Sequence, residues 1–426
     1  MHSRRVFLTM TLGATVLFTS MAACGGGETT QKEGHVKSAT AIAQVFGDGQ
    51  RLTAVAVEFD QDIDNSKLSM STFKVDGLTI TKVYANTAAI TADKGTNGKY
   101  AIVELSPDDQ GAALYAASGR TVTRREAKTS VTQTGTVATT DGDTYAASTK
   151  AIATSKVANL IVDDFKQFEY KDPKTGEILK YNLFIPKNYD KSKSYPLVLF
   201  MHDAGATSTV TTTTLVQGLG AVVWASPSDQ AKHESFVLAP QYSTQVVNDN
   251  SEASDYLDTT VNLVNWLVSQ YSIDKNRLYT TGQSGGAMMS IAMDIKYPDL
   301  FAASFIVAGQ WEPTKVKPLA KDKLWIVVSQ GDLKAYPGQN AIATALEKEG
   351  AKVSRAVWNG RSTAAEFATA VKKMETEGNS INYVALKKGT VVLTGQKDDG
   401  GSNHINTWRI AYAIEGIRDW IFKQHK

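Results

Sequence analysis

The stretch Gly282–Gly286, Gly-Gln-Ser-Gly-Gly, has the residue types and spacing of a nucleophilic serine on a sharp turn. The residues before it, Arg277–Thr281, predict a buried strand, and Ala287–Tyr297 predict a helix that ends before Pro298. A serine between such a strand and such a helix has its hydroxyl exposed, and small neighbours two positions away let the two elements pass closely. The pattern therefore predicts that Ser284 is a catalytic nucleophile.

A nucleophilic serine needs a base to take its proton, and the base needs a partner that holds its tautomer. When the serine lies on such a turn, the base follows both the serine and the acid in the chain. Of the six histidines only His404 and His425 follow Ser284, and His425 is the next-to-last residue. We predict His404 as the base, in a flexible loop just before a final helix from about Thr407 to Phe422.

The acid is expected at the end of a sheet strand between the serine and the histidine. Asp332 follows the apolar run Leu324–Val328 through a turn that contains Gly331, so we predict it as the acid. Asp398 and Asp399 are the alternatives, because they lie near His404 in the sequence.

An oxyanion is stabilised by two backbone N–H groups. One is expected from Gly285, the residue after the nucleophile, and the other from Ala204 in the loop that follows the apolar run Leu197–Met201. Trp311 and Met288, with Met289, are candidates for an acyl-binding pocket, although these side chains could equally belong to the core.

The elements that position these residues begin near Phe165. Apolar runs typical of strands buried on both faces alternate with helical patterns, which indicates a mostly parallel α/β sheet. The expected elements are strands at 181–186, 197–201, 237–239, 301–307, 324–328 and 353–358, and helices at 256–271 and about 340–349.

Residues 37–160 have a different pattern. Short alternating segments, separated by clusters of Gly, Asn and Asp, predict an all-β sandwich. The Thr- and Ala-rich segment 121–149 could form edge strands or a loosely ordered extension. No catalytic set of side chains is evident, so we interpret this half as an accessory domain.

Residues 1–23 have the charged start, apolar stretch and small final residues of an export signal. Arg4 and Arg5 resemble a twin-arginine signal. Cys24, the only cysteine, stands where a bacterial lipoprotein is lipidated, and residues 24–36 predict a flexible tether. We expect an exported lipoprotein on a bacterial cell surface or in the periplasm. The alternative is an ordinary cleaved signal with an accidental cysteine.

Composition limits the other partners. With one cysteine the chain cannot form an internal disulfide. Removal of the signal with Arg4 and Arg5 leaves 43 basic and 43 acidic residues, which gives no electrostatic argument for nucleic acid. No metal-ligand spacing is evident, and we expect no cofactor.

At this point a resemblance is evident. Residues 165–426 resemble an α/β-hydrolase serine esterase of the polyhydroxybutyrate-depolymerase-like and feruloyl-esterase-like group, preceded by a smaller immunoglobulin-like sandwich. The matching features are Pro186 after a strand, the His202 loop, the Ser284 motif, Tyr297-Pro-Asp-Leu-Phe301, and a tail from His404 and Trp408 to Asp419-Trp420. There are two departures: Asp203 replaces the usual glycine after His202, and Asp332 follows Gly331 directly instead of standing three residues after it.

The sequence therefore predicts a serine carboxylesterase that acts on a small-molecule or polymeric ester. Two alternatives remain open. A serine peptidase of the prolyl-oligopeptidase type uses the same three side chains, although the propeller repeats of a full-length member are missing. A non-catalytic surface-binding protein on a hydrolase scaffold would suit the accessory domain and the lipid anchor.

Overall fold

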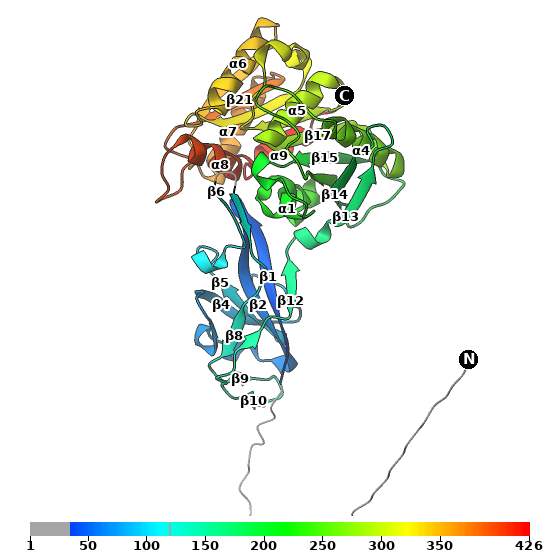
Figure 1. The fold of residues 1–426 in the computed structure, drawn as a ribbon. Coiled ribbons are helices and arrows are strands. Elements are labelled where there is room, and N and C mark those ends of the chain that lie inside the picture. Colours follow the sequence, from blue (N-terminus) through cyan, green and yellow to red (C-terminus); the bar gives the residue numbers. More distant parts are fainter. Residues whose placement is uncertain (1–34, 119–120) are drawn as a thin grey trace, which may run out of the picture. The chain divides into compact units, whose positions relative to one another are not determined.

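The computed structural model describes residues 35–118 and 121–426 (Figure 1). The predicted signal and Cys24 lie outside the described residues, as does almost all of the predicted tether. Within the described ranges, no helix combines the length and the apolar character needed to cross a membrane.

The N-terminal domain is built from two main β-sheets. The larger sheet is mixed: β12 pairs in parallel with β1, and the remaining neighbours are antiparallel. Its strands, in order, are β12 (Lys156–Asn159), β1 (Val36–Phe46), β2 (Gly49–Ile63), β5 (Gly98–Leu105) and β4 (Ile80–Asn86). The smaller sheet contains β11 (Ile152–Ala153), β8 (Ser130–Gln133) and β3 (Phe73–Val75). Two short pairs complete the domain: β6 (Tyr115–Ser118) with β7 (Thr121–Arg124), and β9 (Val137–Ala138) with β10 (Thr144–Tyr145).

The two sheets enclose one apolar core. Alternate residues of β1 and β2, among them Ala41 and Val57, pack against Phe73 and Val75 of β3 and Val131 of β8. Because alternate side chains of a strand point to one face, this pattern produces a sandwich. The predicted all-β domain is confirmed, and the segment 121–149 contains short strands.

The C-terminal domain contains one nine-stranded sheet. Its first two pairings, β13 with β14 and β14 with β16, are antiparallel, and every pairing beyond β16 is parallel. The order is β13 (Lys166–Lys171), β14 (Ile178–Phe184), β16 (Phe236–Gln241), β15 (Tyr195–Met201), β17 (Ile273–Gln283), β18 (Ala303–Val307), β19 (Leu324–Ser329), β21 (Ile381–Leu386) and β20 (Val353–Trp358). The mostly parallel α/β sheet predicted from the sequence is confirmed.

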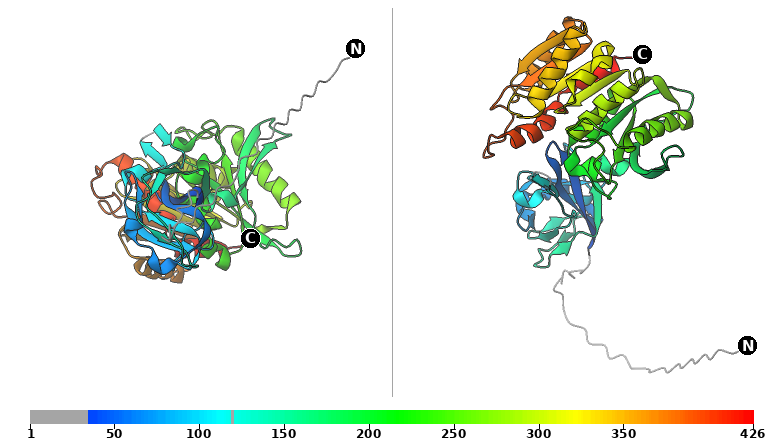
Figure 2. Two further views of the ribbon diagram at one scale, coloured as in Figure 1. Left: turned by 90° about the horizontal axis from the view of Figure 1, so that it is seen from below. Right: turned by 45° about the horizontal axis from the view of Figure 1, so that its top comes forward.

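Helices flank both faces of this sheet (Figure 2). Neighbouring residues of β17 illustrate the arrangement, since they must point to opposite faces. Thr280 Oγ1 lies 3.1 Å from Ser290 Oγ on α5, and Thr281 Oγ1 lies 3.0 Å from the Tyr412 hydroxyl beyond the end of α8. The helices are α1 (Thr213–Val216), α2 (Leu219–Val222), α3 (Pro227–Lys232), α4 (Tyr256–Gln270), α5 (Gly285–Lys296), α6 (Ala335–Lys348), α7 (Ala364–Thr376), α8 (Gly400–Ala411) and α9 (Glu415–Phe422).

The last helix predicted from the sequence, 407–422, is wrong in two respects. It begins earlier, at Gly400, and it is divided between α8 and α9. The division leaves the carbonyl group of Tyr412 without a helical partner, and the Arg418 guanidinium donates a hydrogen bond to it (2.6 Å).

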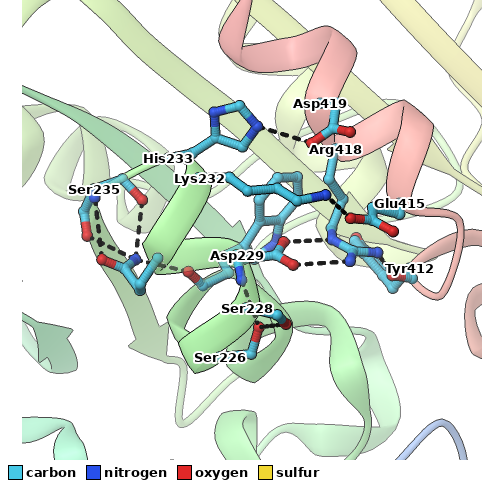
Figure 3. Close-up of polar contacts among 12 residues, drawn as sticks. Ser226, Ser228, Asp229, Lys232, His233, Ser235, Tyr412, Glu415, Arg418 and Asp419 are labelled. Atoms are coloured by element: carbon cyan, nitrogen blue, oxygen red, sulfur yellow. Dashed lines mark hydrogen bonds and ion pairs between the residues drawn. The ribbon is translucent and has the colours of Figure 1, made fainter.

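Helix α9 is fastened to α3 by a buried ion pair (Figure 3). Arg418 donates two hydrogen bonds, of 2.6 and 2.9 Å, to the two carboxylate oxygens of Asp229, and both side chains are less than a tenth exposed. Beside this pair, His233 Nε2 lies 2.8 Å from Asp419 Oδ1, and the His233 ring stacks on Phe422. These contacts tie the last helix of the chain to α3.

Candidate active site

Ser284 lies on a strained turn between β17 and α5. Its φ and ψ are 52° and −116°, a left-handed conformation that is uncommon for a residue with a side chain. Its backbone N–H donates to the Val307 carbonyl of the neighbouring strand β18 (2.9 Å), which holds the turn against the sheet.

Two glycines make this turn possible. A Cβ atom on Gly282 would lie 2.3 Å from the backbone of Gly286, and a Cβ atom on Gly286 would lie 1.9 Å from the Met201 carbonyl oxygen. Strand β17, helix α5 and the neighbouring strand β15 therefore lie too close together for a side chain at Gly282 or Gly286.

The structure brings Ser284, His404 and Asp332 together. Ser284 Oγ lies 2.8 Å from His404 Nε2, and His404 Nδ1 lies 2.5 Å from Asp332 Oδ2. The carboxylate can only accept, so Nδ1 carries the proton and Nε2 is free to accept the serine proton. This is the arrangement that activates a serine nucleophile.

Asp332 is buried and held in place from both sides. Its Oδ1 accepts hydrogen bonds from the backbone N–H groups of Lys334 (3.0 Å) and Ala335 (2.8 Å). Burial acts to raise the pKa of the carboxyl, but the hydrogen bond and charge of His404, together with those two N–H groups, bring the pKa below its usual value. Asp332 is therefore ionised at neutral pH.

His404 lies within α8, and the prediction of a flexible loop at this position is wrong. Asp399 caps the helix by accepting a hydrogen bond from the Ser402 N–H (2.9 Å), which starts the helix at Gly400. Asp398, the other alternative acid, accepts from Asn403 Nδ2 (2.6 Å). Thus Asp332 is the carboxylate that bonds to the His404 ring.

The backbones of Ala204 and Gly285 lie close together. A Cβ atom on Gly285 would be 3.4 Å from the Ala204 nitrogen, and Gly285 is the first residue of α5, where helical N–H groups lack partners. Among the described residues, neither N–H has a hydrogen-bond acceptor. Two free donors at a helix N-terminus can stabilise a negative oxygen.

The loop before Ala204 is held by a buried histidine. His202 Nε2 accepts the backbone N–H of Tyr242 (3.0 Å), so Nδ1 carries the proton and donates to the Asp203 carbonyl (2.7 Å). Burial lowers the pKa of His202, which favours this neutral form. His202 therefore shapes the loop and does not contact Ser284.

Asp203, which replaces the glycine usual in the resembling family, links this loop to the serine turn. Its Oδ1 accepts the Gly205 N–H (2.8 Å), and its Oδ2 accepts from Gln283 Nε2 (3.0 Å). The carboxylate thus bonds to both sides of the space between Ala204 and Gly285.

A small pocket lies beside Ala204 and Gly285. Met289 and Val247 are among its apolar lining residues, and the segment Thr244–Val247 after β16 forms one side. Trp311 and Met288 do not line it and are buried in the core. Sequence reasoning missed Thr244–Val247 because a loop without a repeating pattern gives no signal.

Within residues 35–118 and 121–426, no group of three or more His, Cys, Asp or Glu side chains has the arrangement of a metal site.

Comparison with known proteins identifies the class. Residues 173–396, more than half of the chain, match the family described as "Putative esterase", and residues 38–146 match "Esterase Ig-like N-terminal domain". The chain belongs to this esterase family. A crystal structure described as that of a thermostable esterase is similar, with a TM-score of 0.77 and 28% identity over 92% of this chain and 100% of that chain.

Two curated relatives match shorter stretches. Acetylxylan esterase A of Emericella nidulans is 32% identical over 97 residues, which is 19% of this chain and 32% of that protein. Feruloyl esterase B of Talaromyces stipitatus is 27% identical over 141 residues, 31% of this chain and 36% of that protein. The match spans about a third of the length of each relative. Together with the family, the thermostable esterase identifies the chain as a carboxylic ester hydrolase with an immunoglobulin-like N-terminal domain.

Proposed function

We propose that the chain is a serine carboxylesterase that works through an acyl-enzyme. The observation that carries the proposal is the pair of hydrogen bonds from Ser284 through His404 to Asp332. The N–H groups of Ala204 and Gly285 support it, because two neighbouring backbone donors without a hydrogen-bond acceptor among the described residues could hold a negative oxygen.

The reaction follows from these positions. Ser284 Oγ attacks the ester carbonyl carbon while its proton moves to His404 Nε2, and the carbonyl oxygen becomes an oxyanion held by the two N–H groups. When the carbon–oxygen bond to the alcohol breaks, the alcohol takes the proton from His404. A water molecule then attacks the acyl-enzyme with His404 again as base, which releases the acid and restores Ser284.

The acyl group is proposed to be short. The pocket beside Ala204 and Gly285 is small, and Met289 and Val247 are among its lining residues. Relatives named acetylxylan esterase and feruloyl esterase make acetyl and feruloyl esters the two substrates to compare. The pocket favours the acetyl ester. The comparison needs kcat/KM for p-nitrophenyl acetate, longer p-nitrophenyl esters, methyl ferulate and a peptide anilide. Faster cleavage of the anilide than of every ester would contradict an esterase.

We further propose that the protein is an exported lipoprotein modified at Cys24. Acyl chains on this cysteine would contribute about 0.8 kcal/mol per buried CH₂ to membrane binding. Replacement Cys24→Ser should move the protein from the membrane fraction to the soluble fraction without changing kcat. A Cys24→Ser protein that still pellets with membranes would contradict lipidation.

A further inference from the structure

Asn403 lies beside the proposed base and bonds to the turn that carries the proposed acid. Its side chain is 1% exposed, and its Oδ1 accepts a hydrogen bond from the Ser329 hydroxyl (2.8 Å). Ser329 is the last residue of β19, and its Oγ in turn accepts the Gly331 N–H (3.1 Å). A chain of two hydrogen bonds thus joins helix α8 to the turn before Asp332.

The other end of the Asn403 amide is anchored on α8 and its preceding loop. Nδ2 donates to Asp398 Oδ1 (2.6 Å) and to the Asp399 carbonyl (2.8 Å). Both partners can only accept, so the orientation of the amide is fixed and Oδ1 must face Ser329. A carboxamide therefore fits this position, whereas a carboxylate would face Asp398 without a proton to donate.

The close approach needs a glycine on the opposite side. A Cβ atom on Gly331 would lie 2.1 Å from Asn403 Oδ1. The amide therefore lies directly against the turn that precedes Asp332.

We infer that Asn403 is a positioning residue, which fixes the distance between His404 and Asp332 by joining their two elements. This inference rests on the proposed function. His404 is the next residue on α8, and Asp332 ends the turn that Ser329 starts. A small displacement of one element against the other would lengthen the His404–Asp332 hydrogen bond, and misplacement of about 1 Å can cost 10²-fold in rate.

The test compares Asn403→Ala, Ser329→Ala and the double variant. Each single change should lower kcat by about 10- to 100-fold with KM changed by less than about twofold, because substrate contacts remain. The rate of Ser284 labelling by a fluorophosphonate should fall in parallel. Since both changes break the same link, the double variant should be no slower than the slower single variant.

Asn406→Ala is the matched control. Asn406 is also buried on α8, and its Nδ2 donates to the Ser402 carbonyl, four residues back, as Asn403 does to Asp399. Asn406 has no hydrogen bond to the turn from Ser329 to Asp332. The kcat of Asn406→Ala should therefore stay within about twofold of wild type, even if its unfolding temperature falls as much as that of Asn403→Ala.

Two results would overturn the inference: a kcat in either single variant equal to that of Asn406→Ala, or additive losses in the double variant. If Asn403→Ala does not fold, Ser329→Ala decides alone. The proposed function is judged separately. An inactive wild type, or an active Ser284→Ala variant, would reject both proposals, whereas an active wild type with a normal Asn403→Ala variant rejects only this one.

Discussion

Gly286 and Met201 approach so closely that a Cβ atom on the glycine would lie 1.9 Å from the Met201 carbonyl oxygen. Met201 ends β15 and leads directly into the loop with Ala204, so the contact sets the position of that loop against the serine turn.

Replacement of Gly286 with alanine should therefore damage stability and activity together. The added methyl meets backbone, which cannot rotate away, and overpacking usually costs about 1–3 kcal/mol. We expect a fall in the free energy of unfolding of at least that size and a large fall in kcat, measured by urea denaturation and p-nitrophenyl acetate hydrolysis. Gly401→Ala is the control, because a Cβ atom there would meet only Asp399 Oδ1, at 3.6 Å. Equal losses of stability and of kcat in Gly286→Ala and Gly401→Ala would refute the role assigned to the contact between Gly286 and Met201.

The acid can be tested with an isosteric change. Asp332→Asn should lower kcat by about 10⁴-fold, because the amide holds the wrong tautomer of His404. Asp398→Asn should cost far less, because an amide oxygen can still accept from Asn403 Nδ2. The two kcat values, measured at the same pH, decide between the carboxylates, and a larger loss at Asp398 would show that the acid is misassigned.

The serine turn and the three proposed catalytic residues could be predicted because their signals are local. Gly282, Ser284 and Gly286 stand two positions apart in the sequence, and Asp332 follows an apolar strand. The helical environment of His404 could not be predicted, because Gly400 and Gly401 disfavour a helix and their cost is offset by the Asp399 cap and the packing of Trp408.

Other elements were missed for similar reasons. Helix α6 begins at Ala335, five residues before the predicted start. Pro337 lies in its first turn, where a proline does not break a helix. Helix α7 and strand β21 were not predicted at all. The pocket lining at Thr244–Val247 depends on tertiary packing, which no local pattern encodes.

Stability should depend on pH through Asp322. Burial raises its pKa to about 6, and the negative charge of Asp299 adds to the effect. The folded chain therefore holds this proton more tightly than the unfolded chain, so the stability contributed by Asp322 falls as pH rises from about 4 to about 6 and then stays level.

Asp322→Asn removes this dependence. We expect the variant to gain stability over the wild type at pH 7.5 and to gain little at pH 4, as measured by urea midpoints. Asp299→Asn, which removes only the neighbouring charge, should give a smaller gain at pH 7.5. A gain for Asp322→Asn that is larger at pH 4 than at pH 7.5 would contradict the assignment.

The ion pair between Asp229 and Arg418 should be costly to break (Figure 3). Arg418→Ala leaves a buried carboxylate unpaired and should lower the free energy of unfolding by about 3–5 kcal/mol. Replacing both partners with apolar residues of similar size should recover much of this loss. Thermal or urea unfolding would measure both, and a single variant as stable as wild type would show that the pair is not needed to hold α9.

The most direct test of the account is the kcat of Ser284→Ala beside that of wild type, with fluorophosphonate labelling of both. We predict that wild type hydrolyses p-nitrophenyl acetate and is labelled at Ser284. The variant should keep its unfolding temperature, take up no label and lose activity by about 10⁶-fold, the loss seen when a triad residue is removed from a serine protease. Retention of a tenth of the wild-type kcat, or labelling at another residue, would contradict the assignment of Ser284 as the nucleophile.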